Sequence, residues 1–393
     1  RGLNIYIEND SVRMGGWNFA ENPWGYSGVK EKVETNTPYF AILQFDFDGK
    51  NGNDGIRGSL NGDTLGRLPD ADALHPHAGD IGIGAMNNGA CYEGADEAGD
   101  PTYCGGDASY FEGFIAEIIS GNILYNEAQL KIVHNYLAAK YGSSLPSNDS
   151  LYDYGGTHKY EVFGIGQIDG LNSHNVAQGS GIIRIQDPSQ MTDGNFMIIG
   201  HDDAAASPWS TDEVPGSGDN IRRMAREWRV DKQGGDLGTI SLSIDSTDLD
   251  TLPDGFSEYV LMIDSDGDFT EGAEVYTLSL DTGYYSRDQV NFNKGDHFTI
   301  GIINPSVQFT ATESSIDEDG GSIDVEVNLN YIPTSGFTVD FATSDSTAQF
   351  GQTPIADYDD STGTLTIPAD SSSATIALDV FNDGKGENDE YFK

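Results

Sequence analysis

The sequence predicts an all-β fold of β-sandwich or jelly-roll modules in series, with one short amphipathic helix over about residues 126–141. Short apolar runs with alternating polarity are separated by Gly, Asn and Asp turns, and 49 of the 393 residues are glycine. The 19 Tyr, 18 Phe and 4 Trp are too many for a solvated, disordered acidic chain. At roughly 100 to 200 residues per domain, this length predicts about two to four domains.

The first region, residues 1–142, contains strand-like runs such as LNIYI, YFAILQFDF and DIGIGAM. The run FEGFIAEIISGNILY is interpreted as its last strands. After it, Leu130 and Leu137 are spaced for one face of a helix. Asn126 is placed to cap the start with Gln129 three residues on, and Gly142 marks the end. These positions predict a single helix that closes the first region.

Two further modules follow. Residues 143–156 are rich in Ser, Pro and Gly and are expected to form a linker. Residues 157–303 predict a second β-sandwich-like module through the runs GIIRIQD, NFMIIGHDD, TISLSID, YVLMIDSD and HFTIGII. Residues 304–393 alternate apolar and polar side chains in several runs, which is typical of a seven-stranded sandwich.

The charge of the chain excludes several partners. Sixty-four Asp and Glu stand against 20 Lys and Arg, for a formal net charge of −44. Nucleic-acid binders need clustered Lys and Arg, and an anionic membrane surface is disfavoured for the same reason. No apolar run approaches the ~18 residues needed to cross a membrane, so direct insertion is not expected. A folded chain this acidic needs its self-repulsion offset, and salt or bound divalent cations would serve.

The first two regions resemble modules of bacterial surface proteins. FEGFIAEIISGNILYNEAQLKIVHNYLAAKYG, with TPYFAILQFDFDG and RGSLNGDTLG, resembles laminin-G-like (concanavalin A-like) modules over residues 1–142. The resemblance implies a jelly roll whose opening strands precede residue 1. AREWRVDKQGGDLG and YVLMIDSDGDFTEGAEVYTLSL resemble a β module that follows laminin-G-like modules in very large surface proteins of marine Bacteroidetes.

The last region resembles the Calx-beta family. VDFATSDSTAQFG and ADYDDSTGTLTIPADSSSATIALDVFNDGKGENDEYF match its strands and acidic loops over nearly all of residues 304–393. The resemblance implies one further strand after residue 393 and a Ca²⁺ site made by loop carboxylates. By position, the implied ligands are Glu318, Asp357, Asn382, Asp383, Glu387 and Glu390. Asn382 stands where the family often has a second Asp. The alternative is that these acids only solvate the tips of loops.

A second, weaker metal candidate lies in the run DSDGDF. Asp264, Asp266 and Asp268 share the alternating acids of an EF-hand loop. However, Phe269 stands where that loop needs Gly and Val275 where it needs a bidentate Glu. An acidic hairpin turn explains the three aspartates equally well.

Two smaller sets of residues complete the candidates. Cys91 and Cys104 are the only cysteines, and in a secreted chain such a pair most simply forms one disulfide. Two free thiols would instead fit a cytosolic protein. Trp17, Trp24 and Tyr26 lie in a stretch rich in Gly and Asn, where they either stack on sugar rings as ligand-binding residues or belong to a core.

Together these features predict a fragment of a secreted or cell-surface adhesin, stabilised by Ca²⁺, with an extracellular glycan or surface ligand. The specific expectation is a long protein of attaching or gliding bacteria, exported by outer-membrane secretion machinery. No GxSxG, HExxH or GxxxxGK[ST] motif occurs, and no enzyme is predicted. One alternative is the non-catalytic ancillary region of a polysaccharide-degrading enzyme. Another is a purely structural spacer.

Overall fold

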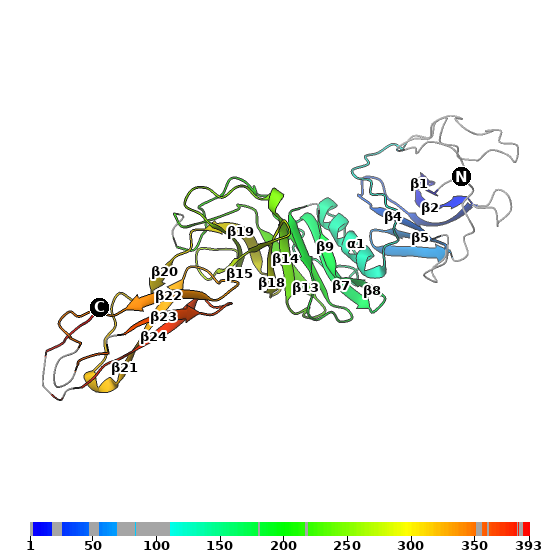
Figure 1. The fold of residues 1–393 in the computed structure, drawn as a ribbon. Coiled ribbons are helices and arrows are strands. Elements are labelled where there is room, and N and C mark those ends of the chain that lie inside the picture. The colour runs from blue at the N-terminus through cyan, green and yellow to red at the C-terminus, as the bar shows by residue number, and fades with distance from the viewer. Residues whose placement is uncertain are drawn as a thin grey trace. The chain divides into compact units, whose positions relative to one another are not determined.

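The computed structural model describes residues 3–17, 26–46, 55–68, 83, 111–179, 181–216, 219–350, 356–359, 361–382, 384 and 388–393. These residues form mostly β-strands in several separate sheets, with one α-helix, which confirms the predicted fold class (Figure 1). The chain divides into two compact units. The first comprises Arg1–His174 with Thr192–Ile198, and the second Asn175–Met191 with Ile199–Lys393.

The first unit opens with two antiparallel three-stranded sheets, of orders β1-β2-β3 and β4-β5-β6. Met14 and Val29 from one sheet and Leu60 from the other contribute to a shared buried core. A Cβ on Gly58 would lie 2.4 Å from Val29, so glycine is required at this close approach. The strands are β1 (Leu3–Glu8), β2 (Ser11–Trp17), β3 (Tyr26–Lys32), β4 (Ala41–Asp46), β5 (Gly55–Leu60) and β6 (Asp63–Leu68).

The predicted helix is confirmed as α1 (Glu127–Tyr141). Asn126 and Gln129 form a capping box, and Gly142 ends the helix in the left-handed conformation at φ 68°. In Figure 1, α1 lies beside β7 (Tyr160–Asp169) and β8 (Asn172–His174). Its buried side chains share a core with β7 and with the start of β11 (Phe196–His201); the members include Ala128, Ile132, Val162, Phe196 and Ile198.

The segment before the helix corrects one expectation. Residues 111–126 form no strand, and Phe114, Ile118 and Ile119 are exposed. A strand needs a neighbour to satisfy its backbone groups, whereas this segment is held by side chains. Glu117 accepts hydrogen bonds from the Tyr136 and Tyr141 hydroxyls at 2.9 and 2.8 Å. Its alternation of apolar residues therefore does not produce the last strands expected over 111–125.

The stretch expected as a linker is folded onto the first unit. Leu151 and Tyr152 are buried in the same core as α1. The amide of Asn135 in α1 donates to the carbonyl of Asp149 and accepts from the Leu151 N–H, both at 2.8 Å. Module boundaries at 142, 156 and 303 stay predictions.

The second unit begins with two sheets. One has the order β17-β18-β14-β10-β9, and another includes β16-β15-β19-β13, with β12 also paired to β19. Each of the five runs predicted over 157–303 contains a strand. The strands are β9 (Val176–Gln178), β10 (Ile183–Gln186), β12 (Ile221–Arg223), β13 (Trp228–Gln233), β14 (Ile240–Asp245), β15 (Glu258–Asp264), β16 (Glu274–Thr277), β17 (Ser279–Asp281), β18 (Tyr284–Val290) and β19 (His297–Ile303), and a 3₁₀ turn, η1 (Ser246–Asp248), follows β14.

The C-terminal part of this unit forms a small sheet β20-β21-β24 and a pair β22-β23. The alternating runs predicted after residue 304 correspond to these strands, and their inward residues include the buried Val327, Ile367 and Ile376. The elements are β20 (Val307–Phe309), η2 (Glu318–Gly320), β21 (Ser322–Leu329), β22 (Phe337–Ala342), β23 (Thr362–Ile367) and β24 (Ser373–Asp379).

Candidate functional site

Backbone hydrogen bonds join three acidic segments at one end of the C-terminal sandwich. Glu318 lies in η2, and the carbonyl of the following Gly321 accepts from the Val380 N–H at 3.0 Å. The next residue, Phe381, donates its N–H to the carbonyl of Asp357 at 2.9 Å. Asn382 follows directly. The segment after β24 therefore lies between the turn that carries Glu318 and the segment that carries Asp357.

The C-terminal segment is tied to the same region. The backbone carbonyl of Tyr391, next to Glu390, accepts hydrogen bonds from the N–H groups of Thr347 and Ala348 at 3.0 and 3.1 Å. Phe392 stacks on the buried Tyr358 ring, with centroids 4.2 Å apart and planes at 9°. Because Tyr358 follows Asp357, these contacts bring the chain around Glu390 to the Asp357 segment.

Four of the six predicted calcium ligands are thus on linked segments, namely Glu318, Asp357, Asn382 and Glu390. Asp383 and Glu387 lie outside the described residues. Asp357 Oδ2 accepts the Gln349 N–H and Asn382 Oδ1 the Gly384 N–H, both at 2.7 Å. All six side chains offer hard oxygen donors, which Ca²⁺ prefers when several converge from different loops. The residues fit this ion, and their assignment as ligands stays a prediction.

Asp345 is a residue of this region that sequence reasoning missed. Its Oδ1 accepts from the Phe350 N–H and from the Tyr358 hydroxyl, both at 2.7 Å. These two hydrogen bonds, that of the backbone first, lower the pKa of the exposed Asp345 carboxyl. Asp345 therefore holds the loop over 345–350 against the residue that follows Asp357.

The second metal candidate has the geometry of a turn. The buried Asp264 accepts the N–H groups of Asp266 and Gly267 at 2.8 Å through one oxygen. Asp266 accepts the Asp268 N–H at 2.9 Å. Phe269, at the position where an EF-hand loop needs Gly, is fully buried in the core of the unit. The carboxylates bend their own backbone, as Asx turns do, which favours the hairpin-turn interpretation.

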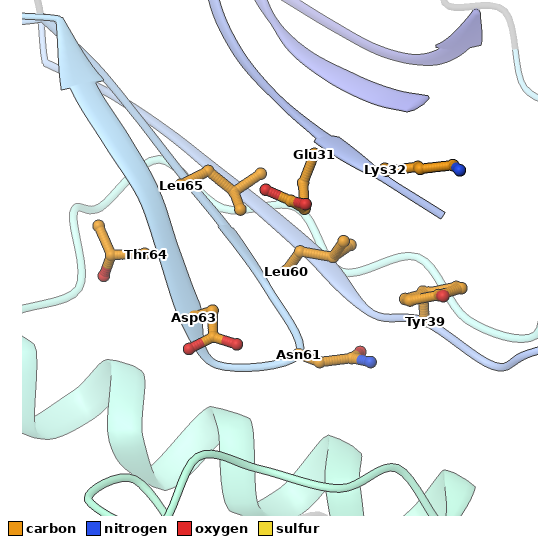
Figure 2. Close-up of a pocket in the computed structure, with 8 residues that line it drawn as sticks. All are labelled: Glu31, Lys32, Tyr39, Leu60, Asn61, Asp63, Thr64 and Leu65. Carbon is orange, nitrogen blue, oxygen red and sulfur yellow. The ribbon is translucent and has the colours of Figure 1, made fainter. Parts of the chain in front are cut away.

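A pocket of ≈ 530 Å³ opens beside β3 and the β5–β6 hairpin (Figure 2). The hairpin turns at Asn61-Gly62, whose φ values of 47° and 87° are those of a type I′ turn. An Asn-Gly pair between alternating runs is a strong signal for such a turn, and it was available in the sequence. The pocket is lined by Glu31, Lys32, Tyr39, Leu60, Asn61, Asp63, Thr64 and Leu65.

Two of the aromatic residues predicted to bind a ligand, Trp17 and Tyr26, lie at the other end of the β2–β3 strand pair. The register of β2 and β3 pairs Trp17 with Tyr26 at one end and Ser11 with Lys32 at the other. Lys32, on the pocket side, is six positions along β3 from Tyr26, roughly 20 Å at the usual rise. Trp24, Cys91 and Cys104 lie outside the described residues.

A buried polar cluster in the first unit was also missed. Ser59 Oγ in β5 lies 3.3 Å from His134 Nε2 in α1, and His134 Nδ1 lies 2.6 Å from Asp149 Oδ2. All three residues are buried, and Lys131 lies 3.2 Å from the other Asp149 oxygen. Burial raises the pKa of Asp149, but the His134 hydrogen bond and the charges of His134 and Lys131 outweigh it and lower the pKa overall. The cluster joins β5, α1 and the loop at Asp149.

Comparison with known families places two matches on the chain. A domain of unknown function (DUF8202) matches residues 129–296, and the Calx-beta domain matches residues 303–393. No curated protein matches the chain. Neither of these two matches covers the residues before 129, and the laminin-G-like resemblance stays a prediction. Calx-beta domains are typically extracellular and bind Ca²⁺ in general. No helix in the described part of the chain is long and apolar enough to span a membrane. Strand pattern, acidic loops and family match agree that residues 303–393 form a Calx-beta domain.

Proposed function

We propose that this chain is part of an extracellular, modular adhesin whose Calx-beta domain is stiffened by Ca²⁺. The observation that carries the proposal is the union of the Calx-beta domain with the preceding module. Both contribute to one buried core, with Val260, Met262 and Phe269 on one side and Val327 and Ile376 on the other. A continuous core resists relative motion of two modules, whereas a flexible linker permits it.

Backbone bonds reinforce this union. Tyr276 of β16 and Ile332 form a parallel β-bridge. The Thr277 N–H donates to the Ile332 carbonyl at 3.1 Å, and the Ile332 N–H donates to the Val275 carbonyl at 2.6 Å. A tandem joined in this way suits a protein that holds a binding surface at a distance from a cell.

Calcium supplies the second part of the proposal. The chain has a formal net charge of −44, and repulsion among loop carboxylates destabilises a compact domain. A divalent cation at the loops of Glu318, Asp357 and Asp383 would offset that repulsion locally. In this proposal the N-terminal module presents a surface for an extracellular glycan or other surface ligand, in attachment or gliding, after export by outer-membrane secretion machinery.

The proposal is tested on intact cells of the producing organism. An antibody against residues 303–393 should bind without lysis, and external protease should remove the epitope faster when a chelator is present. Detection only after lysis, or equal protease resistance in chelator, would contradict it. Two alternatives are tested with the purified chain. Release of reducing sugar from a polysaccharide panel would support an enzymatic role, and absence of saturable binding to any surface or glycan would leave a structural spacer.

A further inference from the structure

The pocket beside β3 is lined by two leucines and by a set of polar side chains, its polar rim. Leu60, which is only 5% exposed, and Leu65 form the apolar part, at the end of the core between the two N-terminal sheets. Figure 2 shows Glu31 beside these leucines and Asn61 at the hairpin turn, with Tyr39 near it. A volume of ≈ 530 Å³ is within the usual range for small-ligand sites.

Two side chains of the rim are held in place by backbone groups. The Tyr39 hydroxyl accepts the N–H of Glu34 at 3.0 Å, while 37% of the residue remains exposed. Asn61 Oδ1 accepts the N–H of Phe40 at 2.9 Å, which leaves its Nδ2 to donate. The aromatic ring and the amide are therefore pre-organised, so that a ligand need not order them on binding.

The chemistry of the rim selects a class of ligand. Glu31 and Asp63 offer carboxylates that accept from hydroxyls, Asn61 and Lys32 offer donors, and Tyr39 offers an exposed ring face. A saccharide carries closely spaced hydroxyls, which can hydrogen-bond to the carboxylates and to the donors, and an apolar C–H face, which can stack on the tyrosine ring. Two carboxylates and one ammonium make the rim net negative, within a chain of charge −44. Uronates and sulfated sugars are repelled by this field.

We propose that this pocket binds a neutral saccharide, with Tyr39 as its stacking platform and Asp63 as a hydroxyl acceptor. The inference rests on the proposed function and supplies the binding surface that it requires. It assigns that surface to the Lys32 end of the β2–β3 pair, opposite to Trp17 and Tyr26.

Calorimetric titration of the whole chain tests this, with laminarihexaose, mannohexaose and xylohexaose as neutral probes and an alginate hexamer as the acidic probe. At least one neutral probe should bind saturably. Tyr39→Ala and Asp63→Ala should each weaken that binding by roughly tenfold, the usual loss when a central contact is removed. Tyr39→Phe keeps the ring but loses the hydrogen bond that orders it, so it should bind more tightly than Tyr39→Ala and less tightly than the unmodified chain.

Matched controls separate this pocket from the other candidates. Trp17→Ala, at the far end of the strand pair, and Tyr160→Ala, another exposed tyrosine, should leave binding unchanged, and so should a chelator. Unfolding temperatures of the variants exclude loss of fold. The inference is overturned if no neutral probe binds, if Tyr39→Ala binds as tightly as the unmodified chain, or if the alginate hexamer binds best. None of these outcomes changes the cell-surface and chelator results, so failure here is distinguishable from failure of the proposed function.

Discussion

The buried guanidinium of Arg287 in β18 forms an ion pair with Asp370 of the Calx-beta domain. The same guanidinium lies 4.9 Å from the centre of the Tyr276 ring. The Asp370 N–H donates to the carbonyl of Pro333 at 3.0 Å, so the carboxylate is on a segment that is itself fixed. One side chain from the second module thus reaches both an aromatic ring and an acid at the junction of the two domains.

Arg287→Ala should uncouple the two domains. The change removes a charge-assisted hydrogen bond and leaves space at the junction, with an expected cost of about 1 to 3 kcal/mol. Scanning calorimetry should show the Calx-beta transition moving to lower temperature and separating from that of the preceding module. Asp370→Asn keeps an acceptor and serves as the milder control. An unchanged single transition in Arg287→Ala would contradict the role of the Arg287–Asp370 ion pair in coupling the domains.

The cluster around His134 predicts that the free energy of unfolding falls in acid. The pKa of Asp149 is lower in the folded chain than its ordinary 3.8, so its carboxylate stabilises the fold above that value. This contribution is lost as the pH falls through the lowered pKa, because the folded and unfolded chains then bind the proton equally. Asp149→Asn should cost about 2 kcal/mol near neutral pH and less in strong acid. Chemical unfolding across this pH range measures it, and a constant difference at every pH would contradict the argument.

The capping box of α1 predicts that substitutions of Asn126 lower the stability of the first unit in proportion to the hydrogen bonds that they remove. Asn126 accepts the Gln129 N–H at 3.0 Å and donates to the Ser173 carbonyl at 2.9 Å. Asn126→Ala removes both hydrogen bonds and should destabilise the first unit by about 1 to 2 kcal/mol in urea unfolding. Asn126→Asp keeps the cap alone and should lose less. Asn148→Ala, an exposed position outside the helix, is the control, and an equal effect there would contradict the role of the cap.

The turn between β15 and β16 should be stabilised by its aspartates without a bound metal. Asp264→Ala removes the acceptor of two backbone N–H groups in a buried turn and should destabilise the second unit by about 1 to 3 kcal/mol. The loss should be the same in Ca²⁺ and in chelator, as judged by thermal unfolding. Asp266→Asn with Asp268→Asn should leave any calcium response intact. Abolition of that response by the double change would show a metal site at this turn.

Much of the fold could be predicted because apolar periodicity, helix caps and turn residues are local features of the sequence. The run TISLSID contains β14, and the run HFTIGII coincides with β19. Asn126 caps the start of α1 and Gly142 ends it, as predicted from their side-chain and backbone chemistry. Residues 111–125 show the limit, because alternation alone does not indicate whether a partner strand is present. Glu117 instead finds its partners 19 to 24 residues away, in α1.

The candidate sites depended on tertiary contacts that no local pattern encodes. The Calx-beta resemblance identified Glu318, Asp357 and Asn382, which the fold places on adjoining segments. The pocket beside β3 could not be predicted, since its lining comes from β3, from Tyr39 before β4 and from the β5–β6 hairpin, which no local pattern brings together. The sequence instead indicated Trp17 and Tyr26, which the strand register places at the other end of the β2–β3 pair. The cluster of Ser59, His134 and Asp149 likewise joins residues 75 and 15 positions apart.

The most direct test of calcium stiffening is thermal unfolding of the whole chain in millimolar Ca²⁺ and in excess chelator, with calorimetric titration of Ca²⁺. An ion that binds only the folded state adds about 2.7 kcal/mol at a hundredfold excess over its dissociation constant. Calcium should therefore raise at least one transition by several degrees. The double change Asp383→Ala with Glu387→Ala should abolish the shift, Glu318→Gln should reduce it, and the neighbouring Asp319→Asn should preserve it. Equal transitions in both solutions, with no heat of binding, would contradict a calcium site at the loops of the Calx-beta domain.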